Sequence, residues 1–220
     1  MGPLDTLKNL ALTALIGAAV CVTKPSAAYA TEYDTLTVAG GCFWCVESDF
    51  ESLPGVIKAE SGYTGGTVAN PTYKQVGKGD TGHYEAVKIT FDPVKVSRKT
   101  LLEKFFRSID PTDVGGQFCD RGAPYRSAVF VSTKRDQDIA EAVKAAAQKA
   151  LGQTIVTPVL KATKFYAAED YHQDYYKGDN LVITRFGPLR QSKAYKRYRE
   201  ACGRDARVQQ LWGSAAAFTH

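Results

Sequence analysis

The order in which extended and helical segments alternate constrains the fold of this chain more than any other feature of the sequence. Strand-like runs at 35–39, 56–63, 83–91 and 127–132 alternate with helical patterns at 42–53 and 99–109. Apolar residues recur at helical spacing in both helical patterns, and Ser97 is a suitable N-cap for the second. The resulting order, β-α-β-β-α-β, predicts an α+β fold with a split β-α-β, or ferredoxin-like, core.

Beyond this core, the sequence predicts additions to one domain. Residues 133–151 are rich in Ala and Lys and predict a third helix, and residues 155–163 predict a further strand. Residues 166–220 are polar, aromatic and weakly periodic, so we expect a long irregular segment that wraps the core. Because no repeat or Pro/Ser-rich linker divides the chain, we expect a single domain over residues 31–220.

The first thirty residues have the pattern of a secretory signal peptide. Lys8 precedes an apolar run at 10–22, which is shorter than the roughly 20 residues that span a bilayer. Ala28-Tyr29-Ala30 follows as a cleavage motif. A buried helix or an uncleaved membrane anchor is the alternative. We expect cleavage after Ala30 and export, to the periplasm, with no membrane segment left in the mature chain.

Composition excludes several classes of protein. The chain is 44% hydrophobic and contains 10 Phe, 12 Tyr and 2 Trp residues, so it has enough apolar material for a folded core. The net charge is only +5, without the concentrated basic stripe of a nucleic-acid-binding protein. We therefore expect a globular monomer with no nucleic-acid partner.

A cysteine pair lies where the first predicted strand meets the first predicted helix. Gly40-Gly41 precede Cys42, and Cys45 follows one helical turn later. Unpaired N–H groups and the helix dipole favour an anion at a helix start, so we expect a lowered pKa and a nucleophilic thiolate at Cys42. The Cys-x-x-Cys spacing alone favours a thioredoxin-like disulfide oxidoreductase. A structural zinc site would need a second ligand pair, and the other Cys and His residues lack matching spacing.

The cysteine pair opens a series of short motifs along most of residues 36–175. The series consists of GGCFWCVESDFESLPGV at 40–56, SGYTGG at 61–66, NPTY at 70–73, GDTGHYEAV at 79–87, FDP at 91–93, DPT at 110–112, YRSAVF at 125–130 and FYAAEDYHQDY at 165–175. In this order, the motifs resemble those of the A-type peptide methionine sulfoxide reductase family. Several motifs in sequence are far more specific than one Cys-x-x-Cys pair.

This resemblance implies that the chain reduces methionine S-sulfoxide, free and in oxidised proteins, to methionine. The implied site residues are Cys42 as nucleophile, Glu85 as catalytic carboxyl group, Tyr73 and Tyr125 as donors to the sulfoxide oxygen, Asp120 as an acidic residue of the same site, and Phe43 and Trp44 as the aromatic wall around the substrate methyl group. A carboxyl group with a raised pKa suits protonation of the oxygen, and two phenols suit stabilisation of its developing charge. Thiol–disulfide exchange by the cysteine pair is the alternative function.

Turnover needs a second thiol, because attack leaves Cys42 as a sulfenic acid that condenses to a disulfide. The resemblance implies reduction of this disulfide by a thioredoxin-like dithiol, without a bound cofactor or metal. Cys45 and Cys202 are the candidate resolving residues. We expect Cys202, in a C-terminal recycling tail near 190–220, because adjacent Gly203 indicates flexibility whereas a helical pair restricts disulfide geometry. Cys119 is either a third relay thiol or an inert core thiol.

Overall fold

The structure, a computed structural model, describes residues 32–219. The expected signal peptide lies outside these residues, so its cleavage stays a prediction. Within the described part of the chain, every helix is too short or too polar to cross a membrane.

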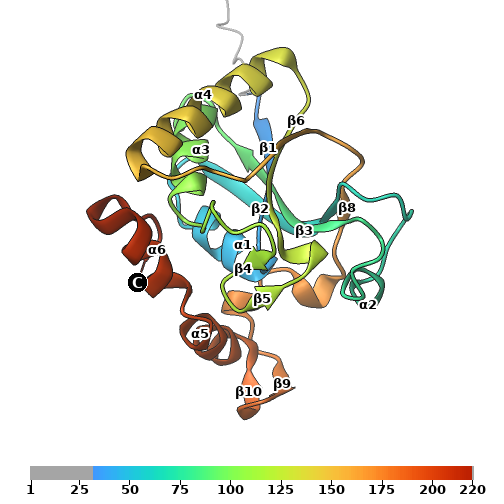
Figure 1. The fold of residues 1–220 in the computed structure, drawn as a ribbon. Coiled ribbons are helices and arrows are strands. Elements are labelled where there is room, and N and C mark those ends of the chain that lie inside the picture. The colour runs from blue at the N-terminus through green and yellow to red at the C-terminus, as the bar shows by residue number, and fades with distance from the viewer. Residues whose placement is uncertain (1–31, 220) are drawn as a thin grey trace, which may run out of the picture. The chain divides into compact units, whose positions relative to one another are not determined.

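A six-stranded sheet forms the centre of the fold (Figure 1). Its order is β7-β6-β1-β3-β2-β8, with β6 and β7 parallel and the other neighbours antiparallel. The strands are β1 (Asp34–Gly40), β2 (Val56–Thr64), β3 (Tyr84–Phe91), β6 (Ser127–Val131), β7 (Val159–Lys161) and β8 (Tyr166–Ala167). The four central strands, with two helices in the connections, confirm the expected ferredoxin-like core.

Three helices cover one face of this sheet and bury the main hydrophobic core. They are α1 (Phe43–Glu51), α3 (Arg98–Phe106) and α4 (Lys134–Leu151). Alternate residues of a strand point to opposite faces, so Val87 and Ile89 of β3 join this core, whereas Tyr84 and Ala86 join a smaller cluster on the other face. Glu85 shares the face of Val87 and therefore points towards the helices.

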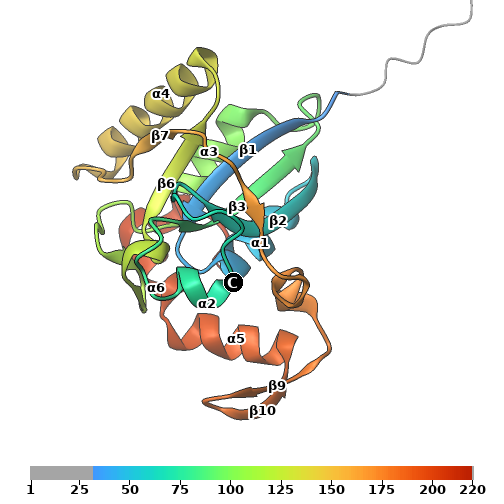
Figure 2. The ribbon, with the colours of Figure 1, turned by 90° about the vertical axis from the view of Figure 1, so that its right-hand side faces the viewer.

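The C-terminal region corrects the expectation of an irregular wrap. It contains a hairpin of β9 (Leu181–Thr184) and β10 (Gly187–Arg190), followed by α5 (Gln191–Ala201) and α6 (Arg204–Trp212). Figure 2 shows the hairpin projecting beyond α5. The buried positions of these two helices include Tyr195, Arg199, Arg204 and Trp212. Because two of these side chains are charged, a search for apolar periodicity misses both helices.

Shorter elements complete the chain around the first turn of α1. They are α2 (Tyr73–Val76), β4 (Gly116–Gln117), β5 (Asp120–Arg121) and the 3-10 helices Ala123–Tyr125, Asp170–His172, Tyr175–Lys177 and Gly213–Ala215. The capping box of Thr72 and Gln75 fixes the start of α2.

Truncation of the core between α3 and the sheet tests this packing. Phe105 is fully buried, so Phe105→Ala removes a ring that the surrounding side chains cannot replace. We expect a loss of about 3–5 kcal/mol in the free energy of unfolding, measured by urea denaturation. Val94→Ala, at a position 87% exposed, is the control and should change it by less than about 0.5 kcal/mol.

Candidate active site

The turn from β1 into α1 places Cys42 at the start of a helix. Gly41 has φ +83°, and a Cβ there would lie 2.6 Å from the Cβ of Gln117. Both the backbone conformation and the space therefore require glycine. Cys42 is the N-cap of α1, and its side chain is only 6% exposed.

A cavity of about 120 Å³ opens beside the Cys42 sulfur. It is lined by Cys42, Phe43, Trp44, Tyr73, Glu85, Asp120, Tyr125 and Tyr198. The fold thus brings together the predicted nucleophile, carboxyl groups, tyrosines and aromatic wall from segments far apart in the sequence. Tyr198, on α5, is the lining residue that sequence analysis missed, because nothing distinguishes it among the 12 tyrosines.

Glu85 is buried beneath the first turn of α1. Its Oε2 accepts a hydrogen bond of 3.1 Å from the backbone N–H of Phe43, one of the unpaired donors at the helix start. Burial raises the pKa of Glu85 to about 8, with a contribution from Asp120, although the Phe43 N–H opposes the rise. At neutral pH the carboxyl group is therefore largely protonated and can donate a proton into the cavity.

The expected lowering of the Cys42 pKa is wrong. Burial raises the pKa of the Cys42 thiol, and Cys45, Glu85 and Asp120 raise it further. The physical reason is burial of the thiol, and the Phe43 N–H at the helix start does not offset it because this donor is bonded to Glu85. The resting site therefore holds a protonated thiol beside a protonated carboxyl group.

Two tyrosines line the cavity opposite the cysteine. Tyr73 begins α2, and its backbone N–H donates to Glu169 Oε1 at 2.9 Å. Tyr125 ends a 3-10 helix, and its hydroxyl group is hydrogen-bonded to that of Tyr73. Burial, and next the charge of Glu85, raise the pKa of both phenols. Both side chains therefore stay protonated and can act as hydrogen-bond donors.

A second polar pair closes the other side of the cavity. The Tyr198 hydroxyl group donates to Asp120 Oδ2. Burial raises the pKa of Asp120, while this hydrogen bond and the charge of Arg204 oppose the rise. Tyr198 therefore joins α5 to the rim of the cavity.

The aromatic wall is held rigidly in place. The Trp44 ring stacks on Tyr175, with centroids 3.8 Å apart and an interplanar angle of 7°. Its Nε1–H donates to His172 Nδ1 at 3.3 Å. Burial lowers the pKa of His172 to about 4, so the imidazole is neutral and accepts this bond. Trp44 therefore presents a fixed face beside the cavity.

The cysteines form two pairs. Cys42 and Cys45 are free and buried, and they pack in one cluster. Cys119 and Cys202 form a disulfide. The expected flexible tail around Cys202 is wrong, because this residue lies between α5 and α6. Gly203 provides the left-handed conformation, φ +67°, that the turn between these helices requires.

Two clusters of potential metal ligands occur among the described residues. Cys119, Asp120 and Cys202 form one, and its two sulfurs are bonded to each other. The second is acidic and contains Glu51 and Asp174, which already pair with Lys177. Neither cluster includes the Cys42 sulfur, and we assign no ion to them.

The comparisons with known proteins agree on one family. Residues 34–213 match the family model described as peptide methionine sulfoxide reductase. Peptide methionine sulfoxide reductase MsrA 2 of Caulobacter vibrioides is 48% identical over 206 residues, which cover 92% of this chain and 98% of that protein. The corresponding MsrA of Bacillus licheniformis is 44% identical over 190 residues, which cover 84% of this chain and 96% of that protein.

Solved structures show the same similarity. The crystal structure of Mxr1 from Saccharomyces cerevisiae in reduced form matches with a TM-score of 0.64 and 29% identity, covering 72% of this chain and 92% of that chain. Methionine sulfoxide reductase A of Corynebacterium diphtheriae matches with a TM-score of 0.58 and 33% identity, covering 65% of this chain and 73% of that chain.

Because the pKa of Glu85 is raised, we predict that its contribution to the free energy of unfolding depends on pH. As the pH rises from 4.5, the ordinary value, to about 8, the unfolded chain loses a proton that the folded protein keeps. The free energy of unfolding of the native chain should therefore fall, relative to that of Glu85→Gln, as the pH rises through this window. Above the window, the difference between the two should become constant. Urea denaturation across the window measures it. Glu141→Gln, at an exposed position on α4, is the control; a constant difference for Glu85→Gln would contradict the buried acid.

Proposed function

Because the chain belongs to the peptide methionine sulfoxide reductase family, we propose that it reduces methionine S-sulfoxide to methionine at the Cys42 cavity. The observation that carries this proposal is the convergence of one thiol, one protonated carboxyl group and two phenols on a cavity of about 120 Å³. A cavity of this size accommodates a methionine sulfoxide side chain and leaves the rest of a polypeptide outside. Free methionine sulfoxide and oxidised proteins are therefore both proposed substrates.

The polar and apolar walls of the cavity orient the substrate. The sulfoxide oxygen accepts hydrogen bonds from Glu85 and from the Tyr73 and Tyr125 hydroxyl groups, which stabilise the charge that develops on it. The methyl group contacts the rings of Phe43 and Trp44. Only one epimer presents its oxygen to the donors and its methyl group to the rings at once, which supports selection of the S epimer.

Reduction transfers one oxygen atom to the cysteine. The Cys42 sulfur attacks the sulfoxide sulfur while Glu85 protonates the oxygen. The S–O bond of the substrate then breaks as an S–O bond to Cys42 forms, and the transient bond between the two sulfurs also breaks, which releases methionine and leaves a sulfenic acid. The thiol proton replaces the one taken from Glu85. The methionine sulfur is reduced by two electrons, and the Cys42 sulfur is oxidised by two.

Cys45 is better placed than Cys202 to resolve this sulfenic acid. Cys45 packs in one buried cluster with Cys42, whereas Cys202 is bonded to Cys119. Condensation of Cys42 with Cys45 forms a disulfide and releases water. This assignment revises the sequence-based preference for Cys202, which depended on a flexible tail.

The second cysteine pair has the exposure that an external reductant needs. Cys42 and Cys45 are 6% and 2% exposed, so a protein dithiol cannot reach a disulfide between them. Cys119 is exposed and Cys202 is half-buried. We propose that the reduced Cys119 and Cys202 pass two electrons inward by dithiol–disulfide exchange, and that a thioredoxin-like dithiol reduces their disulfide.

Export to the periplasm and a monomeric state stay predictions from the sequence. The pattern at residues 1–30 supports the first, and the described residues do not bear on it.

Single-turnover reduction of the two sulfoxide epimers tests the chemistry. The pre-reduced protein should consume only the S epimer, Cys42→Ser should abolish this activity, and Glu85→Gln should slow it by about 10²–10⁴-fold because proton transfer is lost. Glu85→Gln should leave disulfide exchange with a small disulfide unchanged. Consumption of neither epimer by folded protein with free thiols would overturn the proposal in favour of disulfide exchange.

Mapping of the oxidised product tests the two cysteine pairs. After one turnover, Cys45→Ser should retain a Cys42 sulfenic acid that dimedone traps, because its nearest thiol is gone. Cys202→Ser should still form the Cys42–Cys45 disulfide but lose multiple turnover with a protein dithiol. Mass spectrometry of peptides distinguishes these products. A Cys42–Cys202 disulfide in the native chain would reverse the assignment.

A further inference from the structure

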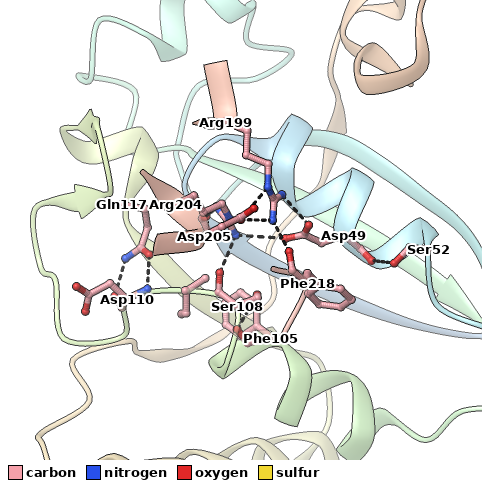
Figure 3. Close-up of polar contacts among 12 residues, drawn as sticks. Asp49, Ser52, Phe105, Ser108, Asp110, Gln117, Arg199, Arg204, Asp205 and Phe218 are labelled. Atoms are coloured by element: carbon pink, nitrogen blue, oxygen red, sulfur yellow. Dashed lines mark hydrogen bonds and ion pairs between the residues drawn. The ribbon is translucent and has the colours of Figure 1, made fainter. Parts of the chain in front are cut away.

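Two buried arginines from the C-terminal helices converge on one aspartate of α1. Arg199 Nη1 donates to Asp49 Oδ1 at 2.7 Å, and Arg204 Nη2 lies 3.6 Å from Asp49 Oδ2 (Figure 3). Arg199, Arg204 and Asp49 are 6%, 2% and 1% exposed. Burial of ion pairs costs much of what their attraction contributes, and apolar residues often serve stability as well. The network therefore calls for a role beyond holding the helices.

Cys45 packs beside this network, because it shares a buried cluster with Tyr195, whose hydroxyl group accepts a hydrogen bond of 3.1 Å from Arg199 Nη1. It precedes Asp49 by one turn of α1 and is 2% exposed. Arg204 Nη1 donates to the carbonyl group of Gly40 at 3.1 Å, two residues before Cys42. The same guanidinium group thus contacts the chain before Cys42 and the side chain one turn after Cys45.

The pairing within the network is incomplete. Among residues 32–219, Asp49 Oδ2 and Arg204 Nε are buried atoms without a hydrogen bond. Buried polar atoms without partners are rare in native proteins and call for an explanation. For the Arg204 Nε–H donor, a negatively charged sulfur at Cys45, one turn before Asp49 on α1, would provide one.

The titratable and charged groups that interact electrostatically with Cys45 come from several elements of the fold. They are Cys42 at the helix start, Glu85 on β3, Asp49 on α1, Tyr195, Tyr198 and Arg199 on α5, and Arg204 on α6. The hydrogen bond with Cys42 lowers the pKa of Cys45 most, Arg204 and Arg199 lower it further, and burial and Asp49 oppose them.

We propose that Arg199 and Arg204 are positioning residues that hold the Cys45 sulfur as a thiolate for attack on oxidised Cys42. The proposal rests on the proposed function, in which Cys45 resolves the sulfenic acid. In that step the Cys45 thiolate attacks the Cys42 sulfur, an S–S bond forms and the S–O bond breaks. The hydroxide leaves as water with the proton of Glu85, whose carboxyl group lies on the same cavity. The Cys42 sulfur is thereby reduced and the Cys45 sulfur oxidised, by one electron each, and the oxygen leaves as water without a change of oxidation state.

This role also links the two cysteine pairs. Arg199 and Arg204 flank Cys202, so one segment of the chain supplies both the cations beside the inner pair and a sulfur of the outer disulfide. Arg204 further packs over the ring of Phe118, with 4.8 Å between its guanidinium carbon and the centroid, directly before Cys119. Docking of α5 and α6 therefore prepares the resolving thiol and places the outer pair next to it.

Titration of a single thiol tests the electrostatic part of this proposal. In the full chain with Cys21, Cys42, Cys119 and Cys202 replaced by Ser, Cys45 is the one remaining thiol, and the Cys42→Ser replacement keeps a hydroxyl donor beside it. Thiolate absorbance should titrate about one pH unit higher after Arg199→Gln or Arg204→Gln, a roughly tenfold change in the ionisation constant. Asp49→Asn should move the titration to lower pH. A purely structural role would not produce opposite signs, and equal or absent shifts would overturn the proposal.

Kinetics test the catalytic part in the chain that keeps Cys42 and Cys45. Disulfide formation after one turnover should slow about tenfold near neutral pH for Arg199→Gln and Arg204→Gln, and Lys at either position should restore it. Release of methionine in the first step should keep its rate. Arg207→Gln is the matched control, because Arg207 lies on the same helix but pairs with Asp110.

The single-thiol titration and the kinetics together distinguish failure of the proposed function from failure of the positioning role. If no methionine is released, the proposed function fails, whereas the single-thiol titration still decides whether the arginines act on Cys45. If a glutamine variant does not fold, the shift of the Cys45 titration to lower pH in Asp49→Asn still reports the sign of the effect. A normal resolving rate in folded Arg199→Gln would contradict the positioning role.

Discussion

The turn between β1 and α1 is the place where the separate parts of this protein meet. Gly41 packs against Gln117 so closely that a methyl group would overlap it. The carbonyl group of Gly40 accepts a hydrogen bond from Arg204, and the N–H of Phe43 donates to Glu85. These contacts come from the short strand β4, a C-terminal helix and a central strand, so a change in any of the three elements reaches Cys42.

The hydrogen bond between the Phe43 N–H and Glu85 affects the protonation of both the Cys42 thiol and the Glu85 carboxyl group. A free helix N-terminus would favour a thiolate at Cys42, but here the first free N–H group serves the carboxyl group instead. Even with this bond, burial keeps the carboxyl group largely protonated at neutral pH. The site therefore combines a buried thiol with a protonated carboxyl group, and we infer that this group donates its proton when a sulfoxide oxygen binds.

The two cysteine pairs differ in exposure, and the roles that we propose for them differ accordingly. The inner pair needs a dry cavity, because water would compete for the donors around the sulfoxide oxygen. The outer pair needs to be reached by a protein. One turn of helix separates Cys42 from Cys45, whereas α5 and the loop before β5 bring Cys202 and Cys119 together from 83 positions apart. The C-terminal helices are thus part of the chemistry that we propose, and their buried arginines connect the pairs.

The core of the fold and most of the cavity follow from the amino-acid sequence alone. Apolar alternation and periodicity located the four central strands and helices α1 and α3, because each buries an apolar face. The Ala- and Lys-rich composition located α4, and the ordered motifs identified Cys42 and Glu85. The remaining features depend on tertiary contacts. Helices α5 and α6 escaped prediction because Arg199 and Arg204 are buried through partners on other elements. The pKa of Cys42 and the pairing of Cys202 likewise depend on groups that only the folded chain brings into contact.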